Sequence, residues 1–194
     1  MGRKAGVAAE ETRAALLGSA AKVFARRGYD GASISEIVSE AGLTSGAIYA
    51  HFASKAELFA ATLRAYAERD LDRVLSGGAA QLMEGLTSVG ASFDRPEPTE
   101  ASLLVSAIIA ARNDPEVAAL VGALLAERET FFKTLVQEAQ AAGVLAPAVS
   151  APAVSRLSLM IAMGSLVVGA LSLPDVEHAE WAAVIDRVVR AFEA

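Results

Sequence analysis

The chain has 194 residues, contains no cysteine and carries a formal net charge of −6 at pH 7. The lack of cysteine excludes disulfides, thiol chemistry and cysteine-based metal sites, and the length allows one compact domain or a small module joined to a larger one. No uninterrupted apolar run reaches the ~20 residues of a membrane span, and no apolar segment follows Arg3 and Lys4 as it would in a signal peptide. We therefore expect a soluble, cytoplasmic protein with no membrane partner.

The acidic excess is unevenly distributed along the chain. Residues 1–70 hold nine Lys/Arg and eight Asp/Glu, a balance of +1, whereas residues 71–194 hold eight and fifteen, a balance of −7. Residues 1–27 alone have a balance of +4. Because local charge rather than the total decides attraction to phosphate, the amino-terminal part is compatible with nucleic-acid binding, although its charge does not establish it.

The chain is predicted to begin with a basic arm followed by a helix. Residues 1–9 are small and basic and predict a disordered arm, which in a DNA-binding protein can reach phosphates or the minor groove. An ordinary frayed terminus is the alternative. Residues 10–27 predict a helix, with acidic residues in its first turn, arginines in its last turn and Gly28 as its stop.

Two short helices joined by a tight turn are predicted for residues 33–52. Ser33 followed by Glu36 is the capping-box pattern that begins a helix, and Gly42 can end that helix in a left-handed conformation. A second helix follows over residues 44–52, with Ile48 and Phe52 on its inward side. This arrangement is that of a helix-turn-helix, whose second helix enters the major groove of DNA.

The exposed side of this segment favours DNA binding over a hairpin that only packs a core. Residues 43–53 contain neither Glu nor Lys, so their surface can approach another surface closely. They also lack Arg, Asn and Gln. Arg, Lys, Asn and Gln are the side chains that make bidentate contacts to bases. We therefore expect modest direct readout of bases, with a larger share from methyl contact, backbone fit and DNA shape.

The rest of the chain predicts further helices and no β alternation of useful length. Their expected ranges are 55–75, 79–92, 100–112, 115–142, 151–172 and 176–192. Asp114 followed by Pro115 predicts the cap and the first residue of the helix over 115–142. The predicted fold class is therefore all-α with about nine helices. It comprises an amino-terminal helix-turn-helix DNA-binding domain over residues 1–54, with its basic arm, and a larger helical ligand-binding and dimerisation domain over residues 55–194.

About the first 60 residues also resemble the TetR-type family of transcriptional regulators. The resemblance begins at Arg13 and is carried by Leu17, Ala20, Ala21, Phe24, Arg27-Gly28-Tyr29, Ala32-Ser33-Ile34, Ile37, Ala41-Gly42-Leu43-Thr44, Gly46-Ala47-Ile48-Tyr49, His51-Phe52, Lys55 and Glu57-Leu58. Beyond these residues it extends only to length and helical layout.

The predicted DNA contacts follow from reach and donor type, and the resemblance implies the same positions. Thr44 and Ser45 open the second helix with unpaired N–H groups and hydroxyls. Lys55 lies in the first turn of the next helix, where a phosphate would compensate for its unfavourable place in the helix dipole. The structural alternatives are that Tyr49 edges the core, that His51 is a satisfied structural histidine and that Lys55 is solvated. The predicted contacts are Ser33, Ser35, Thr44, Ser45, Gly46, Ala47, Tyr49, His51 and Lys55.

The carboxy-terminal part contains soft apolar side chains that suit a ligand cavity, with a few polar groups able to orient a ligand. An ordinary helical core is the alternative for each of them, and the resemblance implies a small-molecule cavity in this region. The predicted pocket residues are Met83, Leu104, Ile108, Arg112, Phe131, Phe132, Met160 and Met163.

The predicted helix over residues 151–172 carries small residues at alternating spacings of four and three, which place them in one stripe and permit close helix approach. With the last helix it could form a four-helix dimer interface across a two-fold axis, and the resemblance implies the same two helices. Packing within one chain is the alternative. The predicted interface residues are Ser158, Ala162, Ser165, Gly169, Trp181, Val184, Ile185 and Val188.

Catalytic chemistry has little support in the sequence. The two histidines, His51 and His178, are far apart, and neither has a motif partner for metal or nucleophilic chemistry. No phosphate-binding glycine loop is present. We therefore predict no catalytic residue, no metal and no cofactor.

Together these features predict a homodimeric, cytoplasmic transcriptional repressor. It would bind double-stranded DNA at a palindromic operator and leave it when a small, largely apolar effector binds. Two alternatives stay open: a helical carrier of small molecules with a vestigial helix-turn-helix, and, with less support, an all-α enzyme.

Overall fold

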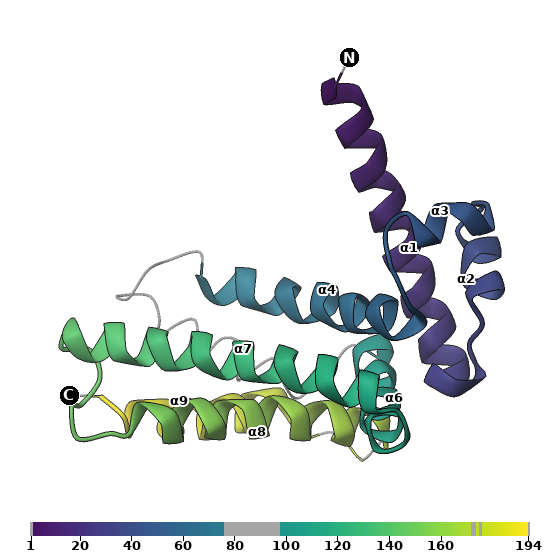
Figure 1. The fold of residues 1–194 in the computed structure, drawn as a ribbon. Coiled ribbons are helices and arrows are strands. Elements are labelled where there is room, and N and C mark those ends of the chain that lie inside the picture. The colour runs from purple at the N-terminus through teal and green to yellow at the C-terminus, as the bar shows by residue number, and fades with distance from the viewer. Residues whose placement is uncertain (1, 76–97, 172–173, 175, 194) are drawn as a thin grey trace. The chain divides into compact units, whose positions relative to one another are not determined.

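The computed structural model describes residues 2–75, 98–171, 174 and 176–193. Within these ranges the regular structure is helical (Figure 1), which confirms the predicted all-α class. The described helices are α1 (Gly2–Gly31), α2 (Ile34–Glu40), α3 (Ser45–Tyr49), α4 (Lys55–Leu75), α6 (Pro98–Asn113), α7 (Pro115–Ala141), α8 (Ala151–Ala170) and α9 (His178–Arg190). The helix predicted for residues 79–92 lies outside the described residues.

The chain divides into two compact units. Unit 1 consists of Met1–Tyr66 and Ser102–Gly122, and unit 2 consists of Ala67–Ala101 and Ala123–Ala194. The helix-turn-helix segment therefore shares its unit with most of α6 and the start of α7, which lie far from it in the sequence. The functional boundary predicted between residues 54 and 55 stays a prediction.

Helix α1 begins earlier than its sequence pattern predicts. Residues 2–9, where the sequence predicts a disordered arm, form its first turns, because Ala, Arg and Lys are among the better helix-forming residues. At the other end, Gly28 has non-helical angles (φ 71°, ψ 173°). That conformation confirms the predicted stop, and it turns Tyr29 back into the core of unit 1.

An aromatic cluster forms the centre of unit 1. Phe24 and Phe59 are fully buried, and their rings meet edge to face with centroids 4.7 Å apart. The ring of Tyr29 completes the cluster at 5.1 Å from that of Phe59. The cluster joins α1 to α4, and the surrounding core takes in buried residues of α2, α3, α6 and α7: Ile37, Ile48, Leu103, Ala107 and Val117.

Unit 2 has a separate, smaller core near the end of α7 and the start of α8. It consists of buried apolar residues: Val136, Ala139, Leu145, Ala151 and Val154. Gln140 donates through Nε2 to the carbonyls of Ala146 and Val149 at 3.0 and 2.8 Å, which holds the loop between the two helices. A bidentate pair from Arg156 to Glu129, with bonds of 2.8 and 2.9 Å, fastens α8 to α7.

Candidate nucleic-acid interface

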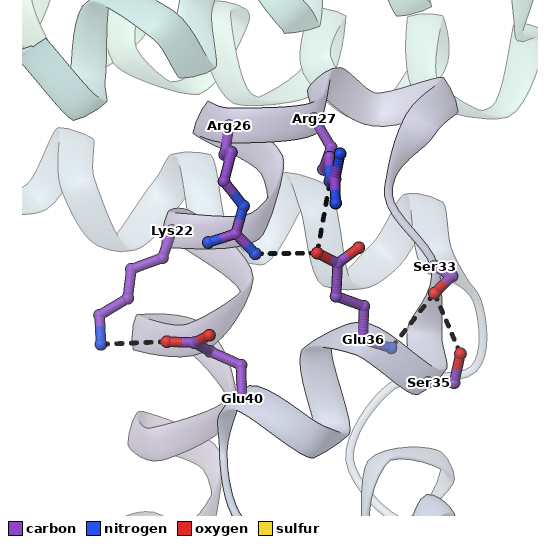
Figure 2. Close-up of polar contacts among 7 residues, drawn as sticks. All are labelled: Lys22, Arg26, Arg27, Ser33, Ser35, Glu36 and Glu40. Carbon is purple, nitrogen blue, oxygen red and sulfur yellow. Dashed lines mark hydrogen bonds and ion pairs between the residues drawn. The ribbon is translucent and has the colours of Figure 1, made fainter.

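The start of α2 is organised by Ser33. Its backbone is extended, and its hydroxyl accepts a 3.1 Å hydrogen bond from the amide of Glu36, which confirms the predicted N-cap. The Ser33 hydroxyl also lies 3.0 Å from that of Ser35, and either hydroxyl can donate. Two predicted DNA contacts therefore lie together at one end of α2 (Figure 2).

The carboxylate of Glu36 is directed to α1 and does not complete the predicted capping box. It accepts hydrogen bonds from Arg26 Nη2 at 2.8 Å and Arg27 Nε at 3.4 Å (Figure 2). The Arg26 bond is the main cause that holds the pKa of Glu36 below its usual value. A second ion pair joins Lys22 Nζ to Glu40 at 3.5 Å. These pairs link α2 to α1. They also give carboxylate partners inside the protein to three basic residues that, from the sequence alone, could have bound phosphate.

The turn between α2 and α3 has the predicted conformation. Gly42 is left-handed with φ 65°, where a side chain would be strained, and the amide of Leu43 donates to the carbonyl of Val38 at 3.0 Å. Thr44 is then the N-cap of α3 and makes no side-chain capping hydrogen bond. Its hydroxyl is therefore available to a phosphate or a base edge.

Helix α3 is shorter than predicted and has one buried side. Ile48, together with Phe52 just after the helix, is buried in unit 1. These two contacts fix which face of α3 turns outward, and the side chain of Tyr49 is 64% exposed on that outward side. Four of the predicted DNA contacts in and just after α3 are exposed or half-buried: Gly46, Ala47, Tyr49 and His51.

Lys55 has partners inside the protein. Its ammonium donates a 3.0 Å hydrogen bond to the carbonyl of Ala32 and lies 4.4 Å from the centroid of the Tyr29 ring. The carbonyl and the ring together compensate for a cation in the first turn of α4. The sequence did not indicate this arrangement, because both partners come from a segment more than twenty residues away. The phosphate contact predicted for Lys55 stays a prediction.

A shared carboxylate links the end of α1 to the start of α7. The Oδ1 atom of Asp114 accepts from the amides of Glu116 and Val117 at 2.9 and 3.2 Å, which confirms the predicted cap of α7. Its Oδ2 atom accepts from the Tyr29 hydroxyl at 3.1 Å. The Val117 amide is the main cause that lowers the pKa of Asp114. Burial, followed by the bond to Asp114, raises the pKa of Tyr29 to about 12.

Replacing Tyr29 with phenylalanine removes the hydroxyl but keeps the ring. We expect the free energy of unfolding at neutral pH to fall by about 1 kcal/mol, the net contribution of one hydrogen bond. Because the folded-state pKa is raised from 10.0 to about 12, this stability is complete below pH 10 and is lost as the pH rises through about 12. Denaturant titrations should therefore show wild type and variant converging over that range, and a constant difference would contradict the proposed bond.

The predicted pocket residues fall in both units. Three belong to α6 in unit 1, one half-buried and two exposed: Leu104, Ile108 and Arg112. Three are half-buried in unit 2: Phe131, Phe132 and Met163. Met160 is 63% exposed, and Met83 lies outside the described residues. The rings of Phe131 and Phe132 are 5.9 Å apart, and the pocket as a set stays a prediction.

The predicted interface residues lie on α8 and α9 of unit 2. The small residues of α8 are half-buried: Ser158, Ala162, Ser165 and Gly169. On α9, Ile185 is buried, Trp181 and Val188 are half-buried, and Val184 is 55% exposed.

A second stripe on α8 and its C-cap is apolar and exposed: Leu157, Met160, Val168 and Leu171. The sequence pattern of small residues missed this stripe. Helix α8 is long and apolar enough to cross a membrane by length and composition alone, although one such helix is weak evidence.

Comparison with known proteins places the helix-turn-helix in a family. Residues 16–62 match the model of bacterial regulatory proteins of the tetR family. The transcriptional activator FasR of Mycolicibacterium smegmatis is 41% identical over 68 residues, which are 35% of this chain and 29% of FasR. The transcriptional repressor BepR of Brucella suis is 34% identical over 109 residues, which are 56% of this chain and 45% of BepR. The chain thus matches less than half the length of either relative.

A solved structure extends the likeness to the whole fold. The structure of Salmonella enterica GusR has a TM-score of 0.74 at 24% identity, covering 93% of this chain and 94% of GusR. FasR is a transcriptional activator and BepR is a transcriptional repressor. Residues 16–62 therefore match the tetR family of bacterial regulatory proteins, and the chain shares its fold with GusR.

Proposed function

We propose that the chain is a homodimeric, cytoplasmic transcriptional repressor that binds a palindromic DNA operator and releases it when a small, largely apolar effector binds. The observation that carries the DNA-binding part is the outward side of α3. Its two buried anchors, Ile48 and Phe52, hold it in unit 1, so that an exposed tyrosine, a glycine and an unbonded N-cap hydroxyl face outward. A surface of this kind suits close approach to the major groove.

Recognition would rest on close fit more than on a code of long side chains. Helix α3 contains no Arg, Lys, Asn or Gln, so bidentate contacts to bases are not available from it. Ala47 offers a methyl contact to thymine, and Tyr49 and Thr44 offer hydroxyls to phosphates. We therefore infer that sequence-dependent DNA shape supplies much of the discrimination.

The dimer proposal is supported by the apolar surface of unit 2. The exposed stripe on α8 and the exposed Val184 of α9 would meet water in a single chain, whereas contiguous apolar patches on soluble proteins mark sites of interaction. A second copy related by a two-fold axis would cover the same patch on both chains. Such a dimer presents two copies of α3, and operator half-sites lie about 34 Å apart along the duplex.

The effector proposal is supported by the chemistry of the half-buried side chains in unit 2. The edge-to-face rings of Phe131 and Phe132 and the thioether of Met163 are adaptable apolar groups. The dimer would have one conformation that fits the operator and one that does not. An effector that binds the second conformation more tightly would lower DNA affinity, by at most the ratio of its affinities for the two conformations.

Selection from a library of random duplex DNA tests the proposed function. We expect the purified chain to enrich a palindromic sequence and to bind it with an affinity that falls steeply with salt. Failure to enrich any sequence, combined with binding of apolar small molecules, would support the carrier with a vestigial helix-turn-helix.

Replacing Lys55 with alanine tests whether its ammonium leaves the Ala32 carbonyl to bind phosphate. We expect weaker binding to all duplexes and a plot of log affinity against log salt whose slope falls by about 1. The measurement is a salt titration on the selected duplex, with wild type as reference. An unchanged slope, with lower thermal stability alone, would assign Lys55 to holding α4 on the end of α1.

A further inference from the structure

The cations of unit 1 differ in the partners that the structure gives them. Lys22 is paired with Glu40, and Arg26 and Arg27 share Glu36. Lys55 is held by a carbonyl and a tyrosine ring. Each of these cations therefore already has a partner in the protein that offsets part of its attraction to a phosphate.

Arg13 of α1 is placed differently. Its guanidinium carbon lies 5.3 Å from the centroid of the Phe52 ring, and the side chain is exposed. Among the residues that the structure describes, no carboxylate forms an ion pair with it. A phenyl ring attracts the cation but offers no lone pair to its five N–H donors, so the group keeps its full capacity for an oxygen anion.

The position of the Phe52 ring gives Arg13 a defined place. Phe52 is buried and follows α3 by three residues, and its ring centroid is 6.3 Å from that of His51. The ring therefore holds the guanidinium just beyond the carboxy-terminal end of α3, in the segment that carries the predicted contact His51. A cation held over a ring loses less rotamer freedom when it binds a ligand than a solvated one.

We propose that Arg13 is a further phosphate-binding residue of the nucleic-acid interface, with the Phe52 ring as its support. The proposal rests on the proposed DNA-binding function. It adds a contact from α1, an element outside the helix-turn-helix, at a residue that begins the family resemblance but is not among the predicted DNA contacts. A planar guanidinium with free donors is suited to bidentate binding of a DNA backbone phosphate.

The test is a salt titration of binding to the duplex selected by the wild-type chain, using Arg13→Gln, Arg13→Lys and the control Lys22→Gln on the same helix. For Arg13→Gln we expect the slope of log affinity against log salt to fall by about 1 for each copy of the chain bound. Each lost contact should make the variant roughly 3.5-fold less sensitive to a rise from 50 to 200 mM salt. Arg13→Lys should keep the slope, because it keeps the charge, and Lys22→Gln should keep it because that cation is already paired.

The outcomes separate this inference from the function on which it rests. A wild-type chain that selects no duplex overturns the proposed function. A wild type that binds, with an Arg13→Gln variant of equal slope, overturns the inference alone and assigns Arg13 to packing on Phe52, even if affinity falls uniformly at all salt concentrations. An equal drop in slope for Lys22→Gln also overturns it, since general charge would then explain the effect. Circular dichroism melting of each variant checks that the fold is retained, and if Arg13→Gln is not folded, the slope of Arg13→Met decides.

Discussion

Replacing Phe59 with alanine is expected to lower the free energy of unfolding of unit 1 by about 3–5 kcal/mol, the range for a fully buried phenylalanine. Phe59 has no exposed surface, and its ring meets those of Phe24 and Tyr29 at 4.7 and 5.1 Å. Alanine would leave a cavity between α1 and α4 that rigid helices cannot close. Because natural domains are stable by only about 5–15 kcal/mol, this one substitution removes a large part of the total.

Denaturant titration followed by circular dichroism measures this loss. Tyr49→Ala is the matched control, since it also removes an aromatic ring from unit 1 but at a site that is 64% exposed, and it should change stability by no more than about 0.5 kcal/mol. A loss below about 1 kcal/mol for Phe59→Ala would show that the aromatic cluster does not hold α4 on α1. DNA binding by the Phe59→Ala variant should fall together with its folded fraction.

The second large effect is expected from Val184→Glu. In the proposed dimer, the two-fold axis places this substitution twice in one apolar interface, and each unpaired carboxylate costs free energy to remove from water. We expect the dimer dissociation constant to rise by at least about 100-fold, which corresponds to about 2.7 kcal/mol. The single chain should keep its fold, because Val184 is 55% exposed in it.

Sedimentation over a concentration series measures the oligomeric state of this variant, and the affinity for the selected duplex should fall with it. Ile109→Glu is the control: Ile109 is also β-branched and 53% exposed, but it lies on α6 in unit 1 and is not one of the proposed interface residues. It should remain dimeric. A Val184→Glu variant that is as dimeric as wild type would place the interface elsewhere, and a wild-type chain that is monomeric would refute the dimer.

Local signals in the sequence predicted the helices well. Ser33, Gly42 and Asp114 act through neighbours within five residues, as caps and turns do, and the structure confirms each of them. The buried side of α3 followed from the spacing of Ile48 and Phe52 in the same way. The capping box failed in its second half, because two arginines of α1 compete for the carboxylate of Glu36 and bind it more strongly than one amide would.

The sequence by itself determined the all-α class, the helix-turn-helix and the resemblance to the TetR family, since these depend on periodicity, caps and a dense local motif. Only the tertiary structure decided which polar groups are already engaged. It placed Lys55 over Tyr29 and Arg13 over Phe52, and it brought Asp114 to Tyr29. The partners in these pairs lie 26 to 85 positions apart in the sequence. Nothing in local spacing records them, because they arise only when separate segments bury their apolar faces in one core.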